Sequence, residues 1–194
     1  MFFGFSHMVI GLFAQLILGS VVESVMGPLK LAFFYLIVMI GSNIFGAVCS
    51  STYSIGPDPI IFALIGCLFA MFALYWPRMG DDWKPKVCMI VSLVMILVVT
   101  IMLLVSQYTM YQRYTTANNI FYPDVYGCIG GFIFGVSSGF MFLPTDRIKT
   151  KAEKAMYIVG LVVTPTLMLA LFLSFFLASK PTKGWYISDK PLLK

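Results

Sequence analysis

Long apolar runs alternate with short polar connectors along most of this chain. A transmembrane helix needs about 20 consecutive, mostly apolar residues. Six runs meet this requirement, at 8–25, 30–49, 59–76, 87–107, 126–143 and 156–178. Within lipid a helix satisfies its own backbone hydrogen bonds, whereas an irregular segment does not. The pattern therefore predicts an all-α, polytopic membrane protein with six transmembrane helices.

The connectors are too short to form a separate soluble domain. We expect a membrane core at 1–154, with the first five runs, and a C-terminal part at 155–194, with the sixth helix and a polar tail. His7 and Glu23 lie near the two ends of the first run. Because no basic region precedes this run and no small-residue cleavage site follows it, we expect a retained span and not a removable signal peptide.

The charged residues are few, and their positions bear on topology. Of the 194 residues 60% are hydrophobic and 11% are charged, with a net charge of +5. The positive charges flank the apolar runs, so they indicate topology and not a nucleic-acid partner. The side reached after an odd number of crossings carries eight of the 13 Lys and Arg residues: Lys30, Arg78, Lys84, Lys86, Arg147, Lys149, Lys151 and Lys154. The positive-inside rule predicts that this side faces the cytoplasm or matrix, with both termini on the opposite side.

The cysteines do not indicate a metal site. They stand at positions 49, 67, 88 and 128, within the predicted spans, and none is closely spaced with another cysteine or with His7, the single histidine. A zinc site needs about four ligands in tetrahedral geometry, which this spacing does not supply. We interpret the thiols as small apolar groups, and we expect no metal or cofactor, with lipids as the bound molecules.

Two short stretches carry the most specific pattern. Residues 54–66 read S-I-G-P-D-P-I-I-F-A-L-I-G, and residues 127–135 read G-C-I-G-G-F-I-F-G. The first resembles the segment S-x-G-x-S-G-x-x-F/Y-A/G-L-x-G of the rhomboid intramembrane serine proteases, and the second resembles their A-H-x-x-G-x-x-x-G. Asp58 stands at the position of the family's nucleophilic serine, and Cys128 stands at that of its general-base histidine.

The resemblance extends toward the N-terminus. In rhomboids the second core helix begins with a histidine and carries an oxyanion-hole asparagine and then a glutamate. Here His7 and Glu23 match the outer two positions, while Gly11 replaces the asparagine. The match covers residues 7 to about 143. It implies a rhomboid-like bundle that lacks the family's first core helix and has an extra C-terminal span at 156–178.

The same resemblance implies that the protease activity is lost. A rhomboid cleaves by serine attack, with the histidine removing the serine proton and polar donors stabilising the oxyanion. Asp58 has no hydroxyl, Cys128 has no imidazole and Gly11 has no side-chain donor, so only His7 is retained. Loss of one member of such a unit already lowers the rate by several orders of magnitude. No histidine lies near Cys128 in sequence or by family position, so we expect no thiol protease either.

The acids near the span ends allow two interpretations. Asp58 and Asp124 each stand at the start of a span, and an aspartyl protease needs two carboxylates that share a proton. The local sequence lacks the G-x-G-D signature of that class. Capping explains both acids more simply, because aspartate is a favoured N-cap and Pro59 suits the first helical position. We likewise interpret Glu23 as a hydrogen-bonding helix anchor and His7 as an interfacial residue.

Small residues indicate how two of the spans pack. Gly127, Gly131, Gly135 and Gly139 recur every four residues along one face of the fifth run. Small residues at this spacing let two helices approach closely. In rhomboids this face packs against the serine-bearing helix, so the resemblance implies contact with the small residues of the third run: Ala63, Gly66 and Ala70. The glycines that pack the helices are retained while the catalytic residues are replaced. This combination favours selection for the shape of the bundle and not for catalysis.

Two functions fit an inert, rhomboid-like body. The first is a structural subunit of a large membrane complex, in the respiratory or ATP-synthesising machinery of the mitochondrial inner membrane, where the partners are other membrane protein subunits and lipids. Trp185 and Tyr186 would contact such a partner or, alternatively, anchor the tail at the membrane interface. The second is a client-binding pseudoprotease, similar to inactive rhomboids and derlins, in membrane protein trafficking or quality control. A transporter or proton channel ranks last, because the spans offer almost no ionisable groups.

Overall fold

The computed structural model describes residues 2–49, 58–76, 125–142 and 151–178, together with scattered residues between 83 and 105. These residues form five long helices: α1 (Phe2–Met26), α2 (Pro28–Cys49), α3 (Asp58–Tyr75), α5 (Val125–Phe142) and α6 (Lys151–Ala178). Each contains a stretch long and apolar enough to cross a membrane. No strand occurs in the described part of the chain. The prediction of an all-α, polytopic membrane protein is confirmed.

The observed helices follow the predicted runs closely, except that two of them begin several residues earlier than predicted. α1 and α6 begin at Phe2 and Lys151, six and five residues before the predicted starts at 8 and 156. Hydropathy reports only the apolar stretch, whereas a helix can continue through more polar residues at either end. The fourth predicted span, 87–107, lies only partly within the described residues, and those described there are helical.

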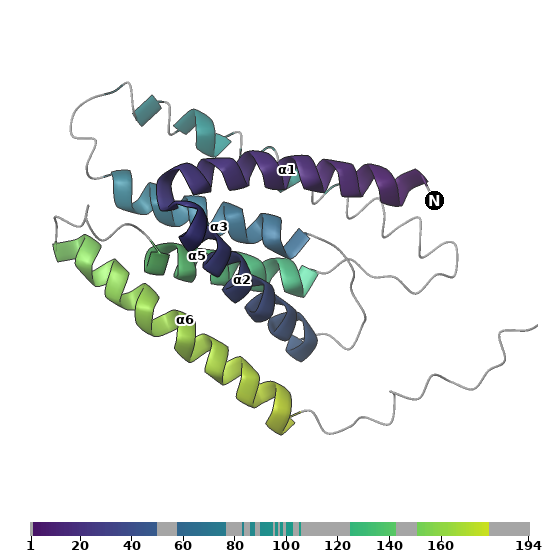
Figure 1. Ribbon diagram of the computed structural model, residues 1–194, viewed down its shortest axis with the longest axis vertical. Coiled ribbons are helices and arrows are strands. Elements are labelled where there is room, and N and C mark those ends of the chain that lie inside the picture. Colours follow the sequence, from purple (N-terminus) through teal and green to yellow (C-terminus); the bar gives the residue numbers. More distant parts are fainter. Residues whose placement is uncertain are drawn as a thin grey trace, which may run out of the picture.

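Helix α3 lies at the centre of the bundle (Figure 1). α1, α2 and α5 pack against it, and α6 packs on the outside against α5 and α2. A helix that is apolar on all sides suits a central position. In agreement, 72% of the apolar stretch of α3 is buried inside the protein, against 11% for α6. α3 shares its most extensive contact with α5, so these two helices form the central pair of the bundle.

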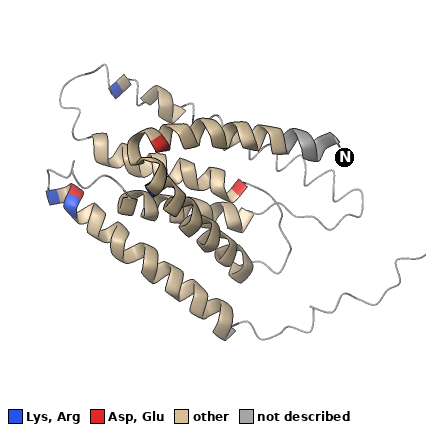
Figure 2. Cartoon of the chain, viewed as in Figure 1, with Lys and Arg blue, Asp and Glu red and all other residues tan. Residues whose placement is uncertain are grey.

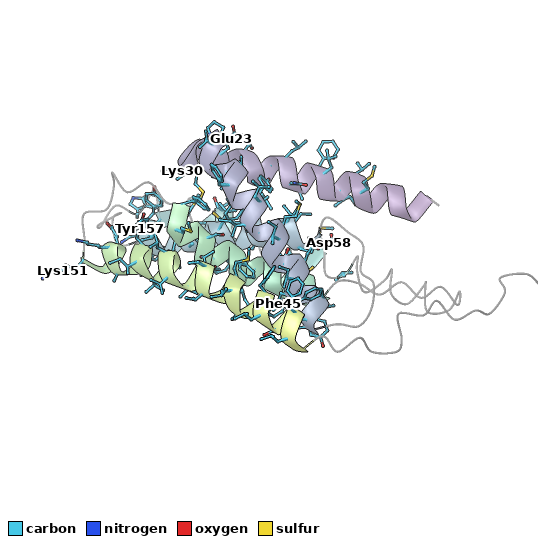
Figure 3. All side chains as sticks on the ribbon, turned by 60° about the horizontal axis from the view of Figure 1, so that its bottom comes forward. Glu23, Lys30, Phe45, Asp58, Lys151 and Tyr157 are labelled. Carbon is cyan, nitrogen blue, oxygen red and sulfur yellow. The ribbon has the colours of Figure 1, made fainter. Side chains whose placement is uncertain are left out.

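Aromatic side chains fill the space between α2 and α5. Phe134 is completely buried, and a methyl group added at Gly41 would lie 2.8 Å from its ring. In the same way, a methyl group at Gly130 would lie 2.8 Å from the Cβ atom of Phe45, which Figure 3 labels. Each ring thus packs against a glycine of the opposite helix, and the two helices run antiparallel.

A single glycine joins α1 to α2. Gly27 has a φ of 85°, in the left-handed region that glycine adopts without steric cost. Its N–H donates to the carbonyl oxygen of Glu23 at 2.8 Å, which terminates α1 in the usual left-handed manner. Pro28 begins α2, where its missing N–H would have no helical acceptor. This tight turn reverses the direction of the chain, and α2 runs back from it at an angle to α1 (Figure 1).

The described basic residues gather at one end of the bundle. Lys30 and Lys151 lie at the end where α1 terminates and α6 begins, together with the other described lysines, whereas Asp58 lies at the opposite end (Figures 2 and 3). A basic excess at one end is the asymmetry from which the positive-inside rule predicts orientation. The side of the membrane that this end faces stays a prediction.

Candidate functional site at the start of α3 and α5

The two residues that the motif resemblance assigns to a rhomboid catalytic pair lie at the beginning of adjacent helices. Asp58 is in the first turn of α3 and Cys128 is in the first turn of α5, and both are buried, at 6% and 4% exposure. The two helices run parallel, since Gly131 meets Pro59 while Gly139 meets residues further along α3. Asp58 and Cys128 therefore lie at the same end of the bundle.

Glycines bring these two helices into backbone contact. A methyl group at Gly131 would overlap with the carbonyl group of Pro59, and one at Gly135 would overlap with the backbone of Ala63. From the other side, a methyl group at Gly66 would lie 2.5 Å from a backbone oxygen of α5. Backbone atoms cannot move aside as the end of a flexible side chain can, so none of these positions has room for a larger residue. The close contact expected between the third and fifth spans is present.

The same face continues at both ends of the contact. Gly127 is buried at the first turn of α5, beside Cys128. At the far end, a methyl group at Gly139 would lie 3.0 Å from the Cβ atom of Ala70 and 3.2 Å from the Cα atom of Cys67. The four glycines thus line one buried face over the length of α5, and the contact is tightest in the middle.

The start of α3 differs slightly from the expected cap. The helix begins at Asp58 itself, which places the acid in the first helical turn. A carboxylate is favoured there by the positive end of the helix dipole. Pro59 is tolerated in the same turn, because an N–H group at that position would have no helical acceptor. Asp58 also interacts with another group. Its role as a cap stays a prediction, and Asp124, the other acid in that interpretation, lies outside the described residues.

An apolar cavity of about 370 Å³ lies beside Cys128. Its walls come from α3, from α5 and from described residues between 93 and 100, and they include Phe62, Ile65, Ile96 and Phe132. Among the described residues of its lining, Thr100 and Cys128 alone carry a polar side-chain atom. Such a cavity can hold an apolar group, for example part of a lipid chain or an apolar side chain, but its described walls contain no histidine or carboxylate beside the thiol.

The other residues that the rhomboid resemblance singles out lie on α1: His7, Gly11 and Glu23. Gly11 is buried in the first half of α1, and the side chain of His7 lies outside the described residues. Glu23 is exposed near Lys30 at the other end (Figure 3). Sixteen helical residues separate His7 from Glu23, which corresponds to about 24 Å. Glu23 and Asp58 lie toward opposite ends of the bundle (Figure 3), and the role of Glu23 as an anchor stays a prediction.

The polar residues near Glu23 form a small cluster between α1 and α2. The Tyr35 hydroxyl is hydrogen-bonded to the side chain of Gln15 and lies within the electrostatic reach of Glu23. A methyl group at Gly19 would lie 3.0 Å from the same hydroxyl. Within the ranges that the structure describes, no three His, Cys, Asp or Glu side chains gather in a way that could hold a metal ion.

Sequence analysis did not single out three buried residues of α6. Glu153 and Thr164 are only 3% and 2% exposed, and a methyl group at Gly160 would lie 2.7 Å from the Cβ atom of Phe140 on α5. Sequence analysis assigned Glu153 to the connector before the sixth helix, because the predicted span began at 156. The good helix formers around it could have extended the helix, and a Thr-Pro pair inside an apolar run could have marked Thr164.

The family comparison covers the part of the chain that holds this site. The family model of the Rhomboid domain matches residues 1–145. The chain belongs to the rhomboid family. The matched segment of this rhomboid-family protein contains α1, α2, α3 and α5, so the predicted rhomboid-like bundle is confirmed, and α6 follows the matched segment. No curated protein and no solved structure matches the chain significantly.

Proposed function

We propose that this rhomboid-family protein is catalytically inert and acts as a structural subunit of a larger membrane complex. One observation carries the proposal: α3 and α5 keep their backbone contact, while the residues that the motif resemblance assigns to the nucleophile and base are Asp58 and Cys128. Serine proteolysis needs a hydroxyl nucleophile and a base within hydrogen-bond reach of it. Neither a carboxylate nor a thiol supplies the missing hydroxyl or imidazole.

The outer surface of the bundle supports a role in assembly. Large apolar side chains are exposed on α1 and α6, among them Phe13, Ile17, Leu169 and Phe176. In a membrane these faces meet lipid or the spanning helices of other proteins. A rigid central pair with large apolar flanks suits a body that fills a defined space between neighbours, and lipids would fill the gaps that remain.

The mitochondrial inner membrane is the host that we propose, because its respiratory and ATP-synthesising complexes contain many spanning subunits without chemistry of their own. Trp185 and Tyr186, which lie outside the described residues, are the proposed partner contacts in the tail. Buried aromatic residues of this kind each contribute about 2 kcal/mol or more to an interface.

Native purification tests this proposal. A tagged chain, isolated from its own membranes in a mild detergent, should migrate as one large species with a fixed set of partners in constant stoichiometry. Deletion of residues 181–194 should release the chain from that species while its spans stay inserted, and Asp58→Asn should leave the species intact. Two outcomes would contradict the scaffold role. The chain could purify alone, or the complex could stay intact after the tail deletion while Asp58→Asn abolishes the activity of the complex.

Probe labelling tests catalytic inertness separately. Incubation with a fluorophosphonate should give no labelled product, and a model rhomboid substrate should survive incubation with the protein in liposomes. Reproducible labelling or cleavage that disappears in Asp58→Ala or Cys128→Ala would show that an altered active site operates at these positions.

A client-binding pseudoprotease is the second candidate function. The apolar cavity beside Cys128 favours it, since a cavity at a former catalytic position could hold the apolar side chain of a client. Purification separates the two candidates, because an escort protein should yield a set of partners that changes with the membrane proteins being made. A fixed stoichiometric set supports the structural subunit.

A further inference from the structure

The described charges are distributed unevenly between the two ends of the bundle. The end where α1 terminates and α6 begins carries four lysines: Lys30, Lys86, Lys151 and Lys154. Figure 3 shows Lys30 and Lys151 at this end and Asp58 at the opposite one. These lysines come from three segments that are far apart in the sequence, so the fold gathers them on one surface. We call this surface, defined by the four lysines, the basic surface.

Carboxylates offset only part of the charge of the basic surface. Glu23 is the exposed acid at this end, near Lys30 (Figure 3). Glu153 is only 3% exposed and already interacts with another group of the protein. Among the described residues, none of the four lysines is paired with a carboxylate. Their ammonium groups are therefore available to an external anion.

The helices do not explain the lysines at their own starts. Lys151 and Lys154 lie within the first turn or so of α6, and Lys30 lies in the first turn of α2. The start of a helix is the positive end of its dipole, which disfavours a cation. These lysines therefore do not stabilise the helices that carry them, and a nearby anion would offset an unfavourable arrangement.

Aromatic residues place the basic surface at the boundary of the membrane. Trp76 directly follows α3, Trp83 precedes Lys86, and both tryptophans are exposed. Tyr157 lies one turn into α6 at the same end (Figure 3). Tryptophan and tyrosine gather at the level of lipid headgroups, where their rings are apolar and their N–H or O–H groups meet water. The ammonium groups at this end thus lie at the depth of lipid phosphates.

One face of α6 changes from basic to apolar as it enters the membrane. Lys154, Ile158 and Val162 recur every four residues, which places them on one face of the helix. All three side chains are exposed. A phospholipid has the same order of groups, with a phosphate at the membrane boundary and an acyl chain below it.

We propose that the basic surface binds the headgroups of anionic phospholipids, with the phosphate at Lys151 and Lys154 and an acyl chain along Ile158 and Val162. Each lysine near an anionic membrane surface strengthens such binding about fivefold. An acidic segment of a partner protein would match the lysines, but it would leave the apolar face below them uncovered. The inference goes beyond the subunit role, because the chain alone carries this surface.

Tryptophan fluorescence in vesicles of defined composition tests the proposal. Trp185→Phe leaves Trp76 and Trp83 as the emitting residues. The full chain is reconstituted in phosphatidylcholine that contains a minor fraction of brominated phosphatidylglycerol or, in parallel, of brominated phosphatidylcholine. Bromine quenches tryptophan on contact, so phosphatidylglycerol should quench with about fivefold or higher relative affinity. Salt at about 1 M should remove this preference, because it shortens the Debye length to about 3 Å.

Charge-matched variants locate the contact. The preference should disappear when all four lysines of the basic surface are changed to Gln. The control changes four lysines that follow α6, at the other end of that helix, and should keep the preference at the same net charge: Lys180→Gln, Lys183→Gln, Lys190→Gln and Lys194→Gln.

A single reporter tests the start of α6 directly. Ile158→Trp, with the three native tryptophans changed to Phe, should show the preference for phosphatidylglycerol. Adding Lys151→Gln and Lys154→Gln should lower it by about fivefold or more. Thermal unfolding in detergent verifies that each variant folds.

Four results would overturn the proposal. They are equal quenching by the two lipids, a preference that persists at high salt, a preference that survives loss of the four lysines, and an equal loss in the control. Equal quenching would leave an acidic partner protein as the occupant. The salt series needs only the Trp185→Phe chain, so it decides the matter even if a lysine variant fails to fold. Because the vesicles contain no host complex, the result is independent of the native purification.

Discussion

The α3–α5 contact and the α2–α6 groove are opposite ways of packing helices in the same bundle. Between α3 and α5, glycines such as Gly135 let backbone meet backbone. Between α2 and α6, bulky residues such as Ile40 and Phe172 line a gap, with the unpaired Thr164 on its wall. Lipid is as apolar as a leucine side chain, so helices in a membrane associate through close packing and polar contacts and not through the hydrophobic effect. The first interface is complete, whereas the second leaves a gap between its helices.

The single glycine of α6 makes the difference sharper. Gly160 packs closely on α5 near Phe140 and Ser137, so the first half of α6 is fixed to the bundle. Beyond Pro165 the described side chains are exposed or half-buried. One helix thus contains both kinds of surface.

The largest expected effect comes from the buried ring between α2 and α5. Phe134→Ala should lower the free energy of unfolding by about 3–5 kcal/mol, because it opens a cavity against Gly41 that the backbone cannot close. Phe176→Ala on the exposed part of α6, where the ring is 61% exposed, should change it little. Unfolding of both variants in mixed micelles measures the difference. Equal losses would mean that α6 is packed as firmly as the core.

A single added methyl group tests the backbone contact. Gly135→Ala should destabilise the protein by about 2–3 kcal/mol, since the new Cβ atom would overlap with the backbone of Ala63. Gly19→Ala is the matched control, because its Cβ would meet only the Tyr35 hydroxyl, which can shift. The same unfolding assay applies. A neutral Gly135→Ala would show that α3 and α5 are further apart than described.

Removal of the orphaned hydroxyl should stabilise the isolated chain. Thr164→Val keeps the shape of the side chain and deletes a buried group without a partner, so we expect a gain of about 1 kcal/mol. Thr166→Val removes an exposed hydroxyl that bonds to its own helix and should be close to neutral. Thermal unfolding of the purified variants compares the two. A clear loss of stability in Thr164→Val would show that the hydroxyl already has a partner.

The smallest effect is expected at Asp58. Asp58→Asn keeps a hydrogen-bonding oxygen in the first turn of α3, where the helix dipole favours a negative charge by about 0.3–1 kcal/mol. We therefore expect a loss within that range and unchanged assembly. The measurement is unfolding in detergent together with native gel mobility. A severe loss of either would mean that the carboxylate is essential to this end of the bundle.

Much of the helical core was predictable from the sequence. Apolar runs located five of the described helices, because a spanning helix must be long and almost free of charge. The four-residue spacing of Gly131 and Gly135 predicted the face that meets α3, since only glycine allows backbone contact. The resemblance to the rhomboid motifs implied that this face meets the helix of Asp58, and the structure places Asp58 and Cys128 at the same end of that contact. The roles of Trp185 and of Asp124 stay predictions, because both lie outside the described residues.

Tertiary structure alone decided which other faces are buried. In a soluble helix an apolar stripe marks the core, but in a membrane the lipid-facing side is equally apolar, so hydropathy does not separate α3 from α6. Burial of Glu153 and Thr164 depends on where α6 lies against α5 and α2, which no local pattern specifies. The chain by itself determined the number and packing face of its central helices. The groove and its unpaired hydroxyl arise only when α6 is placed beside α2, because they belong to the space between two helices far apart in the sequence.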